Sequence, residues 1–369
     1  MTDPRVEKFA HVLVDYSTDI QPGERVMIEA TTAAEPLVRS VYKRVLERGG
    51  HPHILLSLPD QEEILFATGN DEQLEFVPTL HKISVEQFDA RIRIYSEVNT
   101  RAHTQVDPAR LARRQKAISG VQSIVFRRAA EGKLRWISTQ FPTHAYAMEA
   151  EMGINAYQDF VYRACHVDEG TPDPVAYWRE VGVRQQRFIN LLQGHDQVRV
   201  QSADIDLRLS IKDRIFMNSC GKRNLPDGEI YTGPVEESVE GWVRFTYPAV
   251  YSGQVVEGVE LRFEQGKVVQ AAAAKNEGLL QRMLDSDAGA RYVGEFAVGT
   301  NYQIDRFTRN ILFDEKIGGT FHMALGAGYL ETGSHNKSVI HWDMIGDLTK
   351  DGQITADGEV VYRNGQFVS

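Results

Sequence analysis

The chain has 369 residues, of which 42% are hydrophobic and 25% are charged, and its formal net charge is −10. This length exceeds what a single hydrophobic core usually serves, so we expect two domains. The acidic balance argues against a nucleic-acid-binding protein, because such proteins carry clustered positive charge.

Cysteine usage and hydropathy narrow the class of protein further. The two cysteines, Cys165 and Cys220, are too few for a disulfide framework or a thiolate zinc site, which indicates a reducing compartment. The N-terminal stretch "MTDPRVEKFAHVLVDYS" alternates charged and apolar residues, so it reads neither as a signal peptide nor as an anchor. No run approaches the roughly 18 apolar residues of a membrane span. We therefore expect a cytoplasmic protein without membrane contact.

The first part of the chain alternates helical and strand patterns. A helix is predicted at about 4–18 and another across "AAEPLVRSVYKRVLERGG", where Gly49 and Gly50 end it. The predicted strands share apolar, β-prone composition and lie at 24–30, 53–58, 90–97 and 133–139. Strands separated by helices predict an open, largely parallel α/β sheet. No GxGxxG or GxxxxGK[ST] follows any of them, so no nucleotide-binding residues are expected.

The pattern changes in the second half. Residues 143–194 are mostly helical and we place a boundary near Gly194. Beyond it "DQVRVQSADIDLRLSI" alternates with period two, and a hairpin is predicted to turn at Gln265-Gly266. The Asp-Gly and Asn-Gly pairs of "KDGQITADGEVVYRNGQFVS" predict a meander. We thus expect an α/β N-terminal domain with connecting helices at 1–194 and a β-rich α+β domain at 195–369.

One stretch of the second domain, "SVIHWDMI", places His341 and Asp343 inside an apolar run. In a strand these two side chains share one face while Ile340, Trp342 and Met344 share the other. A buried carboxylate needs a partner. Two interpretations stay open for this pair alone: a hydrogen-bonded core histidine with a salt-bridged aspartate, or half of a metal site.

Further ligand candidates occur upstream in the same domain. Glu229 lies in "NLPDGEIYTGP", Glu295 in "RYVGEFAVGTN", and Glu315 and His322 in "ILFDEKIGGTFHMALG". Taken singly, Glu229 reads as a surface turn acid, Glu315 as a solvated acid and His322 as a core histidine. Glu295 is different, because its apolar neighbours make an unpaired carboxylate costly.

Taken together, these residues form a set of carboxylates and imidazoles without a thiolate. Such a set suits zinc, cobalt, manganese or magnesium better than copper(I) or an iron–sulfur cluster. Six ligand residues are more than a protein usually provides to one catalytic zinc ion. A pair of metals that shares a bridging carboxylate uses that number.

The blocks "NLPDGEIYTGP", "GEFAVGTN", "FDEKIGGTFHMALGAGY" and "HWDMI", in that order, resemble the M29 family of metallo-aminopeptidases. The N-terminal "FAHVLVDYSTDIQPGERVMIEA" is also similar to the opening of that family, so the resemblance spans nearly the whole chain. It implies a homodimer with an α/β N-terminal domain and a C-terminal domain that holds two divalent metal ions, commonly cobalt, zinc or magnesium. The implied activity is removal of the N-terminal residue from peptide substrates.

The resemblance also implies roles for individual residues. Tyr329 matches the proposed catalytic tyrosine of the family, and Glu295, which lies in the most apolar of the acidic stretches, is our candidate for the bridging carboxylate. The implied metal ligands are Glu229, Glu295, Glu315, His322, His341 and Asp343.

Two other functions fit part of the pattern. The same scaffold resembles iron-dependent dioxygenases that open dihydroxypyridine rings, in which two histidines and one carboxylate bind a single Fe(II). Such a site would leave Glu229, Glu295 and Glu315 without a use. A non-catalytic binding protein on an inherited scaffold is the third hypothesis, and the complete ligand set with Tyr329 argues against it.

Overall fold

The computed structural model describes residues 3–251 and 253–368, which divide into two compact units. The first unit contains the chain up to Tyr177 together with Gly221–Pro226, and the second contains Trp178–Cys220 and the chain from Asp227 onward. The boundary that we place near Gly194 lies inside the second unit. Nothing in the sequence pattern marks the return of the short segment 221–226 to the first unit.

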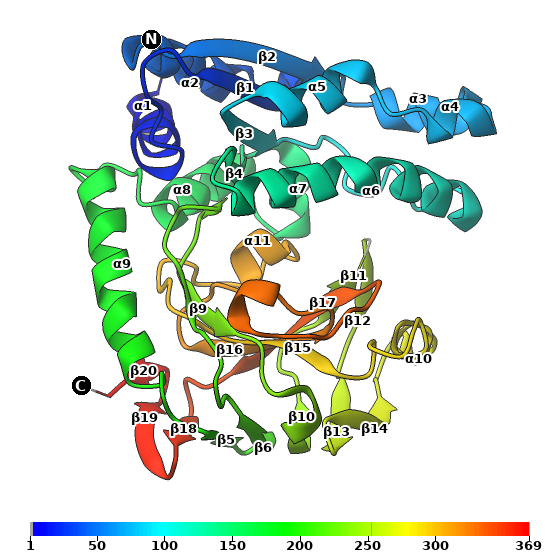
Figure 1. Ribbon diagram of the computed structural model, residues 1–369, viewed down its shortest axis with the longest axis vertical. Helices are drawn as coiled ribbons and strands as arrows, with labels where there is room; N and C mark the ends of the chain where they lie inside the picture. Colours follow the sequence, from blue (N-terminus) through cyan, green and yellow to red (C-terminus); the bar gives the residue numbers. More distant parts are fainter. Residues whose placement is uncertain (1–2, 252, 369) are drawn as a thin grey trace. The chain divides into compact units, whose positions relative to one another are not determined.

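The first unit is built on a parallel five-stranded sheet of order β2-β1-β3-β4-β8 (Figure 1). Every neighbouring pair in it is parallel. Its strands are β1 (Arg25–Thr31), β2 (His51–Ser57), β3 (Ala90–Tyr95), β4 (Arg135–Gln140) and β8 (Asn224–Leu225). The prediction of a largely parallel α/β sheet is confirmed. The last strand comes from the segment 221–226, which explains why that segment belongs to this unit.

Helices connect these strands, as parallel pairing requires. The helix expected over 4–18 is α-helical to His11 and continues as a π-helical turn. Helix α2 packs against β1 and β2, and α6 packs against α4 and α5. The helical segments are α1 (Pro4–His11), η1 (Val12–Ser17), η2 (Thr32–Ala34), α2 (Glu35–Glu47), α3 (Gln61–Thr68), α4 (Asp71–Glu75), α5 (Thr79–Gln87), α6 (Pro108–Ala130), α7 (His144–Glu149) and α8 (Ile154–Ala164). Within the described ranges, no helix combines the length and the apolar character needed to cross a membrane.

The second unit contains two larger antiparallel sheets. The eight-stranded sheet has the order β14-β13-β10-β6-β5-β18-β19-β20. Its strands are β5 (Gln197–Ser202), β6 (Ile205–Ser210), β10 (Glu240–Arg244), β13 (Glu260–Glu264), β14 (Lys267–Ala272), β18 (Gln353–Ala356), β19 (Glu359–Arg363) and β20 (Gln366–Phe367). The predicted turns are present: Gln265-Gly266 joins β13 to β14, and Asp357-Gly358 and Asn364-Gly365 have the positive φ angles of hairpin turns.

The five-stranded sheet has the order β17-β16-β15-β9-β7. Its strands are β7 (Met217–Ser219), β9 (Glu229–Thr232), β15 (Val293–Gly299), β16 (Thr320–Gly326) and β17 (His341–Asp347). A two-stranded ribbon and short helical segments complete the unit: β11 (Ala249–Tyr251), β12 (Gln254–Val256), η3 (Glu236–Ser238), α10 (Glu277–Leu284), α11 (Ile311–Asp314) and η4 (Leu330–Thr332). Helix α9 (Pro174–Asn190) begins in the first unit and continues into the second.

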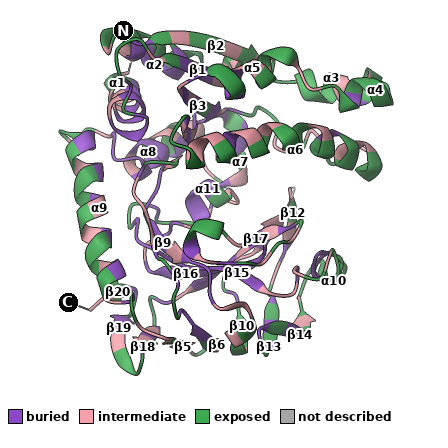
Figure 2. Cartoon of the chain, in the orientation of Figure 1, coloured by how far each residue is buried: buried purple, intermediate pink, exposed green. Residues whose placement is uncertain are grey.

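The main core of the second unit lies between its two larger sheets. Phe296, Phe321 and Trp342 of the five-stranded sheet belong to the same buried cluster as Leu207 and Phe263 of the eight-stranded sheet. Every residue of β15 and β16 is buried (Figure 2). Burial of each large apolar side chain contributes roughly 1.5–3 kcal/mol, so this cluster anchors the five-stranded sheet firmly.

Candidate metal centre

The face of the five-stranded sheet that points away from this core carries the site. Alternation along each strand sends Ile230, Phe296, Phe321, Trp342 and Met344 into the core, so their neighbours point to the opposite face. Those neighbours are Glu229 and Tyr231 of β9, Glu295 of β15, His322 of β16, and His341 and Asp343 of β17. The period-two pattern that predicted a shared face for His341 and Asp343 is therefore repeated on three further strands.

Small residues lie between the functional side chains on this face. Ala324 pairs with Glu295 on one side and Asp343 on the other, and Ala297 lies between His322 and Tyr231. The pairing of β15 and β16 shifts between Val293 and Glu295, where Gly294 lies. A Cβ atom on Gly294 would come 2.3 Å from the carbonyl oxygen of Gly326, so only glycine fits this irregularity. The alanines leave room above the sheet between the carboxylates and imidazoles.

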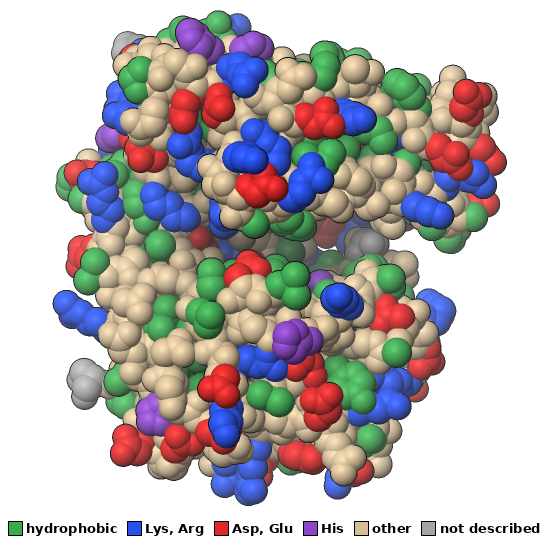
Figure 3. Space-filling view, in the orientation of Figure 1, with side chains coloured by type: hydrophobic (Ala, Val, Ile, Leu, Met, Phe, Trp, Pro, Cys, Tyr) green, Lys and Arg blue, Asp and Glu red, His purple; other side chains and the backbone are tan. Residues whose placement is uncertain are grey.

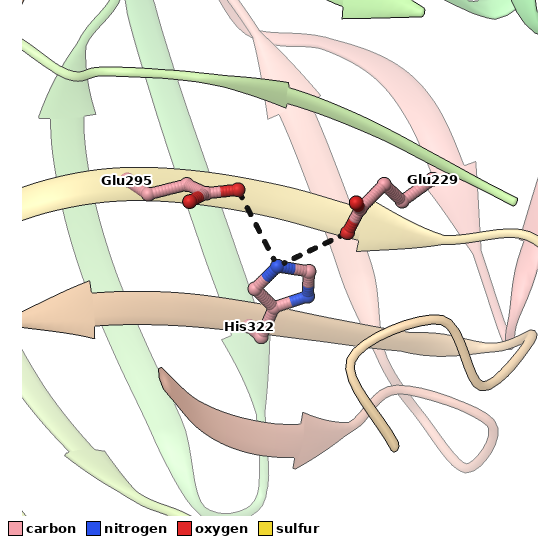
Figure 4. Close-up of side chains that lie close together, drawn as sticks. All are labelled: Glu229, Glu295 and His322. Atoms are coloured by element: carbon pink, nitrogen blue, oxygen red, sulfur yellow. Dashed lines mark ion pairs between the residues drawn. The ribbon is translucent and has the colours of Figure 1, made fainter. Parts of the chain in front are cut away.

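His322 lies between two carboxylates (Figure 4). Its Nε2 is 3.3 Å from Oε2 of Glu229 and 3.6 Å from Oε1 of Glu295. The other oxygen of Glu295, Oε2, is 3.3 Å from Nε2 of His341, which is itself 3.5 Å from Oδ1 of Asp343. The two oxygens of Glu295 therefore face two different imidazoles.

The six predicted ligand residues form three overlapping groups whose ligand atoms lie within 4.8 Å of one another. The groups are Glu229 with Glu295 and His322, Glu295 with His341 and Asp343, and Glu315 with His322 and Asp343. The structure thus brings all six together. Glu295 links the first two groups.

Glu315 reaches the cluster from outside the sheet. It follows α11, whose last residue, Asp314, accepts hydrogen bonds from the backbone N–H and the hydroxyl of Thr308 at 2.7 and 2.8 Å. Burial raises the pKa of Asp314 to about 7. Lys316, the next residue, is fully buried; it forms an ion pair with Glu315, and its Nζ lies 3.6 Å from Oε1 of Glu229. Lys316 offsets part of the negative charge that the cluster gathers.

One backbone contact fixes the tautomer of His341. Its Nδ1 lies 2.8 Å from the carbonyl oxygen of Ala327. A carbonyl only accepts, so Nδ1 carries the hydrogen and donates it. When the ring is neutral, Nε2 carries the lone pair on the side that faces Glu295 and Asp343, and this arrangement is typical of histidines that bind metals.

The electrostatics of the cluster favour cations. Considering protein groups alone, burial raises the pKa of Glu229 to about 8. Burial lowers the pKa of His322, but the neighbouring carboxylates of Glu295 and Glu229 outweigh this and raise it to about 9. Both groups therefore retain protons at neutral pH, and the nearby carboxylates of Glu295 and Glu315 add to the effect of burial on Glu229. Divalent cations could take the place of those protons.

Unpaired atoms provide a test of whether the residues suit a metal. Among the described residues, four buried atoms of the cluster have no hydrogen-bond partner: Oε2 of Glu229, Nδ1 and Nε2 of His322, and Oδ1 of Asp343. Buried polar atoms are rarely left in this state. Oxygen and nitrogen donors without sulfur suit zinc, cobalt, manganese or magnesium, so the cluster fits the predicted ions.

Tyr329 lies beside the cluster, at the start of η4. Its ring centroid is 5.2 Å from that of His341 and 5.4 Å from that of Tyr231. Tyr329 is 37% exposed, so part of this residue is accessible to solvent. Burial of the hydroxyl, reinforced by the charges of Glu295 and Asp343, raises the pKa of Tyr329 well above its usual value. The hydroxyl therefore keeps its proton and can donate it in a hydrogen bond.

Two further residues of the site were not predicted from the sequence. Lys316 is the charged residue that directly follows Glu315, and the search for charges in apolar stretches considered only acids and histidines. Tyr231 lies two residues after Glu229, so period-two alternation places both on one face. Applying that rule to β9 would have found it.

Known proteins similar to this chain are found both by sequence and by structure. A model of the family Peptidase_M29, described as thermophilic metalloprotease (M29), matches residues 2–367. Aminopeptidase 2 of Geobacillus stearothermophilus is 28% identical, with 99% of this chain and 98% of the relative covered. Aminopeptidase T of Thermus aquaticus is 27% identical, with 98% of each covered.

A solved structure has the same fold. Wild-type AmpT from Thermus thermophilus superposes with a TM-score of 0.87 at 23% identity, and 99% of each chain is covered. This likeness confirms the two-part α/β architecture. The family model covers almost the entire chain, with the sheet face described above inside it, so the chain belongs to the M29 family of metallopeptidases and is an enzyme of the hydrolase class.

Proposed function

We propose that this protein is an aminopeptidase that removes the N-terminal residue from peptides by means of two divalent metal ions. The observation that carries the proposal is the position of Glu295, because its two oxygens face His322 and His341 separately. A carboxylate placed in this way can bridge two ions, whereas a site for one ion needs no such sharing. The printed names of the relatives, Aminopeptidase 2 and Aminopeptidase T, support the reaction class.

The ligand groups suggest how the residues are divided between the ions. Glu229 and His322 would hold one ion, His341 and Asp343 the other, and Glu295 both. Glu315 lies within reach of His322 and Asp343 and would complete the set. Zinc, cobalt and magnesium fit these donors. When bound, such ions lower the pKa of water from about 15.7 towards 7 and polarise carbonyl groups.

The protein groups around the ligands have distinct tasks in this proposal. Tyr329 donates a hydrogen bond to the oxygen of the scissile carbonyl as negative charge develops on it. Lys316 holds the carboxylates of Glu229 and Glu315 in place. The carbonyl of Ala327 keeps His341 in the tautomer that leaves Nε2 free.

The other functions considered from the sequence receive less support. A dioxygenase with one Fe(II) would use two histidines and one carboxylate, and it would gain nothing from the buried Glu229 and Glu295 and the partly buried Glu315 beside them. A non-catalytic role is at odds with membership of a metallopeptidase family. The homodimer and the cytoplasmic location stay predictions.

Hydrolysis of matched peptides tests the proposal. Leucyl-glycine should release leucine when zinc or cobalt is supplied, and a chelator should abolish the release until metal is restored. N-acetyl-leucyl-glycine, which has no free terminal amine, should remain intact. Cleavage of both peptides at equal rates would indicate an endopeptidase or acylase, and oxygen consumption with bound iron would favour the dioxygenase.

A further inference from the structure

The first unit contains a cavity of about 710 Å³ that the proposed peptidase reaction does not use. Its floor is formed where three parallel strands end: Thr31 in β1, Ser57 in β2, and Tyr95 in β3. Segments around α3, α4 and α5 provide the walls. This volume lies within the range of about 300–1,000 Å³ typical of small-molecule sites.

The position of the cavity in the sheet is the one that α/β proteins use for ligands. From β1 the chain crosses to β2 on one side and later returns to β3 on the other side. A crevice outside the carboxyl ends of the strands forms where the direction of crossing reverses. Here the N–H and the hydroxyl of Thr31 donate to Oγ and the carbonyl of Ser96 at 3.1 and 2.8 Å, which joins the two strand ends at the cavity.

Two cations in the cavity, Arg93 and Arg114, form no ion pair with a carboxylate of the described residues. The side chain of Arg93 makes no hydrogen bond or ion pair with any described residue, and its guanidinium lies 4.7 Å from the ring centroid of Tyr95. Arg114 is only 8% exposed; it donates to the carbonyls of Leu74 and Phe76, and its Nε has no hydrogen-bond partner within the described ranges. A nearly buried guanidinium with an unused N–H is suited to bind a carboxylate.

Of the four acids that line the cavity, Glu63 and Glu97 form no ion pair with any described residue, and the charge of Arg93 acts on Glu97. Glu29 is already paired with Arg91, with Nη2 2.5 Å from Oε2, and Glu62 lies 3.6 Å from His103. Glu97, just beyond the end of β3, forms no ion pair with any described residue. Burial raises the pKa of Glu97, although the residue is partly open to solvent, and the charge of Arg93 opposes this rise.

The remaining lining mixes polar and apolar residues, and its apolar side chains form part of the wall. Leu55, Leu58, Ile64, Phe76 and Ile94 contribute to the wall, and Leu58 and Phe76 are strongly exposed. A ligand with an apolar side chain would bury this surface. The cavity therefore combines unpaired positive charge, an unpaired carboxylate and an apolar wall.

We propose that this cavity binds a small zwitterion with an apolar side chain, that is, an apolar amino acid or short peptide. Its carboxylate binds Arg93 and Arg114, its ammonium group binds Glu97, and its side chain contacts the apolar wall. Phosphate is a poor alternative for two reasons. Acids line the cavity, and the turn after β1, "TTAAE", contains none of the glycines of a phosphate-binding loop. The site is independent of the metal centre, and its existence does not depend on the proposed peptidase function.

Calorimetric titration of the full chain, after chelator treatment to prevent hydrolysis, tests this site. The probes are leucine, leucyl-leucine, 4-methylpentanoate, which lacks the ammonium group, and leucinamide, which lacks the carboxylate. A zwitterion site should bind leucine or leucyl-leucine at least ten times more tightly than 4-methylpentanoate and leucinamide. Equal binding of leucine and 4-methylpentanoate, or tighter binding of inorganic phosphate, would overturn the proposal.

Substitutions of cavity residues test whether leucine binds in this cavity. Arg93→Gln should weaken leucine binding at least tenfold, and Glu97→Gln should weaken leucine but leave 4-methylpentanoate unchanged. Arg39→Gln is the matched control, because Arg39 lies on α2, pairs with Glu35 and does not line the cavity. If Arg93→Gln does not fold, the affinities of Glu97→Gln for leucine and 4-methylpentanoate test the proposal by themselves. Leucine binding that survives both cavity variants, or that is lost in Glu295→Gln, would place the ligand at the metal centre and refute the proposal.

Discussion

Tyr329 and the six ligand residues have separable roles at the scale of single residues. The hydroxyl of Tyr329 retains its proton and lies beside His341 without belonging to any of the three ligand groups. We expect Tyr329→Phe to lower kcat about 10²–10³-fold, as removal of an oxyanion donor does elsewhere, while metal content stays unchanged. Turnover and metal analysis on the same samples measure both.

Tyr42→Phe is the control for this variant, because Tyr42 lies on α2 in the other unit and is 38% exposed. It should turn over substrate at the parental rate. A Tyr329→Phe enzyme that matched it would remove the hydroxyl from the mechanism, and a loss of bound metal would reassign Tyr329 to the ligand set.

A second prediction at the scale of single residues concerns Lys316. Its replacement by methionine removes the buried cation from between Glu229 and Glu315. Loss of one partner from a buried ion pair typically costs about 3–5 kcal/mol, so metal-free Lys316→Met should be destabilised by this order. Added zinc should recover part of the loss, since a divalent ion also offsets the carboxylates. Denaturant unfolding with and without zinc measures it, with the exposed Lys350→Met as control. A cost below about 1 kcal/mol would contradict the assigned role.

At the scale of elements, strand β17 distinguishes a metal site from a salt-bridged core pair. Only a ligand couples the folding equilibrium to metal concentration. The chelator-treated parent protein should gain thermal stability as zinc or cobalt is added, and Asp343→Asn should lose most of that gain yet stay folded. Asp347→Asn, at the end of the same strand, should retain it, since Asp347 caps the N–H of Thr349. Equal metal responses in all three proteins would make "SVIHWDMI" a core strand.

The ion pair of Glu29 in strand β1 predicts how the stability of the fold depends on pH. Burial opposes ionisation of Glu29, but the hydrogen bond and charge of Arg91 outweigh it and lower the pKa of this carboxyl below its usual 4.5. The charges of Arg93 and His81 act in the same direction. The pair therefore stabilises the folded chain above about pH 4.5, and this contribution is lost as the pH falls through the folded-state pKa.

Unfolding free energies at pH 7 and below pH 4 test this sign. Glu29→Gln should be less stable than the parent at pH 7 by about 3 kcal/mol, because Arg91 is left unpaired, and the difference should shrink on acidification. Glu35→Gln, which breaks an exposed pair with Arg39, should cost less than about 1 kcal/mol at either pH. A difference that grew on acidification would show that the Glu29 pKa is raised.

The same elements show what the sequence could predict. Period-two alternation predicted the shared face of His341 and Asp343, and apolar surroundings marked Glu295 as a carboxylate in need of partners. Strand pairing could not be predicted, because contact between β9, β15, β16 and β17 depends on register across residues far apart in the chain. The pairing of β8 with β4 and the cavity at the ends of β1, β2 and β3 depend on such long-range contacts too.

At the scale of the whole molecule, the charge balance is acidic. The chain carries a net charge of −10, and Figure 3 shows acidic and basic side chains interspersed over the face that it displays. Nothing on that face resembles the basic stripe of a nucleic-acid-binding protein. The prediction that nucleic acid is not a partner still awaits a binding assay.

The central claim is that one chain holds two divalent ions that share Glu295. Metal analysis of chelator-treated protein after titration with zinc or cobalt, performed alongside leucine release, tests it most directly. We predict that activity appears as loading approaches two ions per chain. Glu295→Gln should bind fewer ions and stay inactive, because its amide cannot serve both groups. Saturation at one ion per chain with full activity, or an unchanged stoichiometry in Glu295→Gln, would contradict the dinuclear centre.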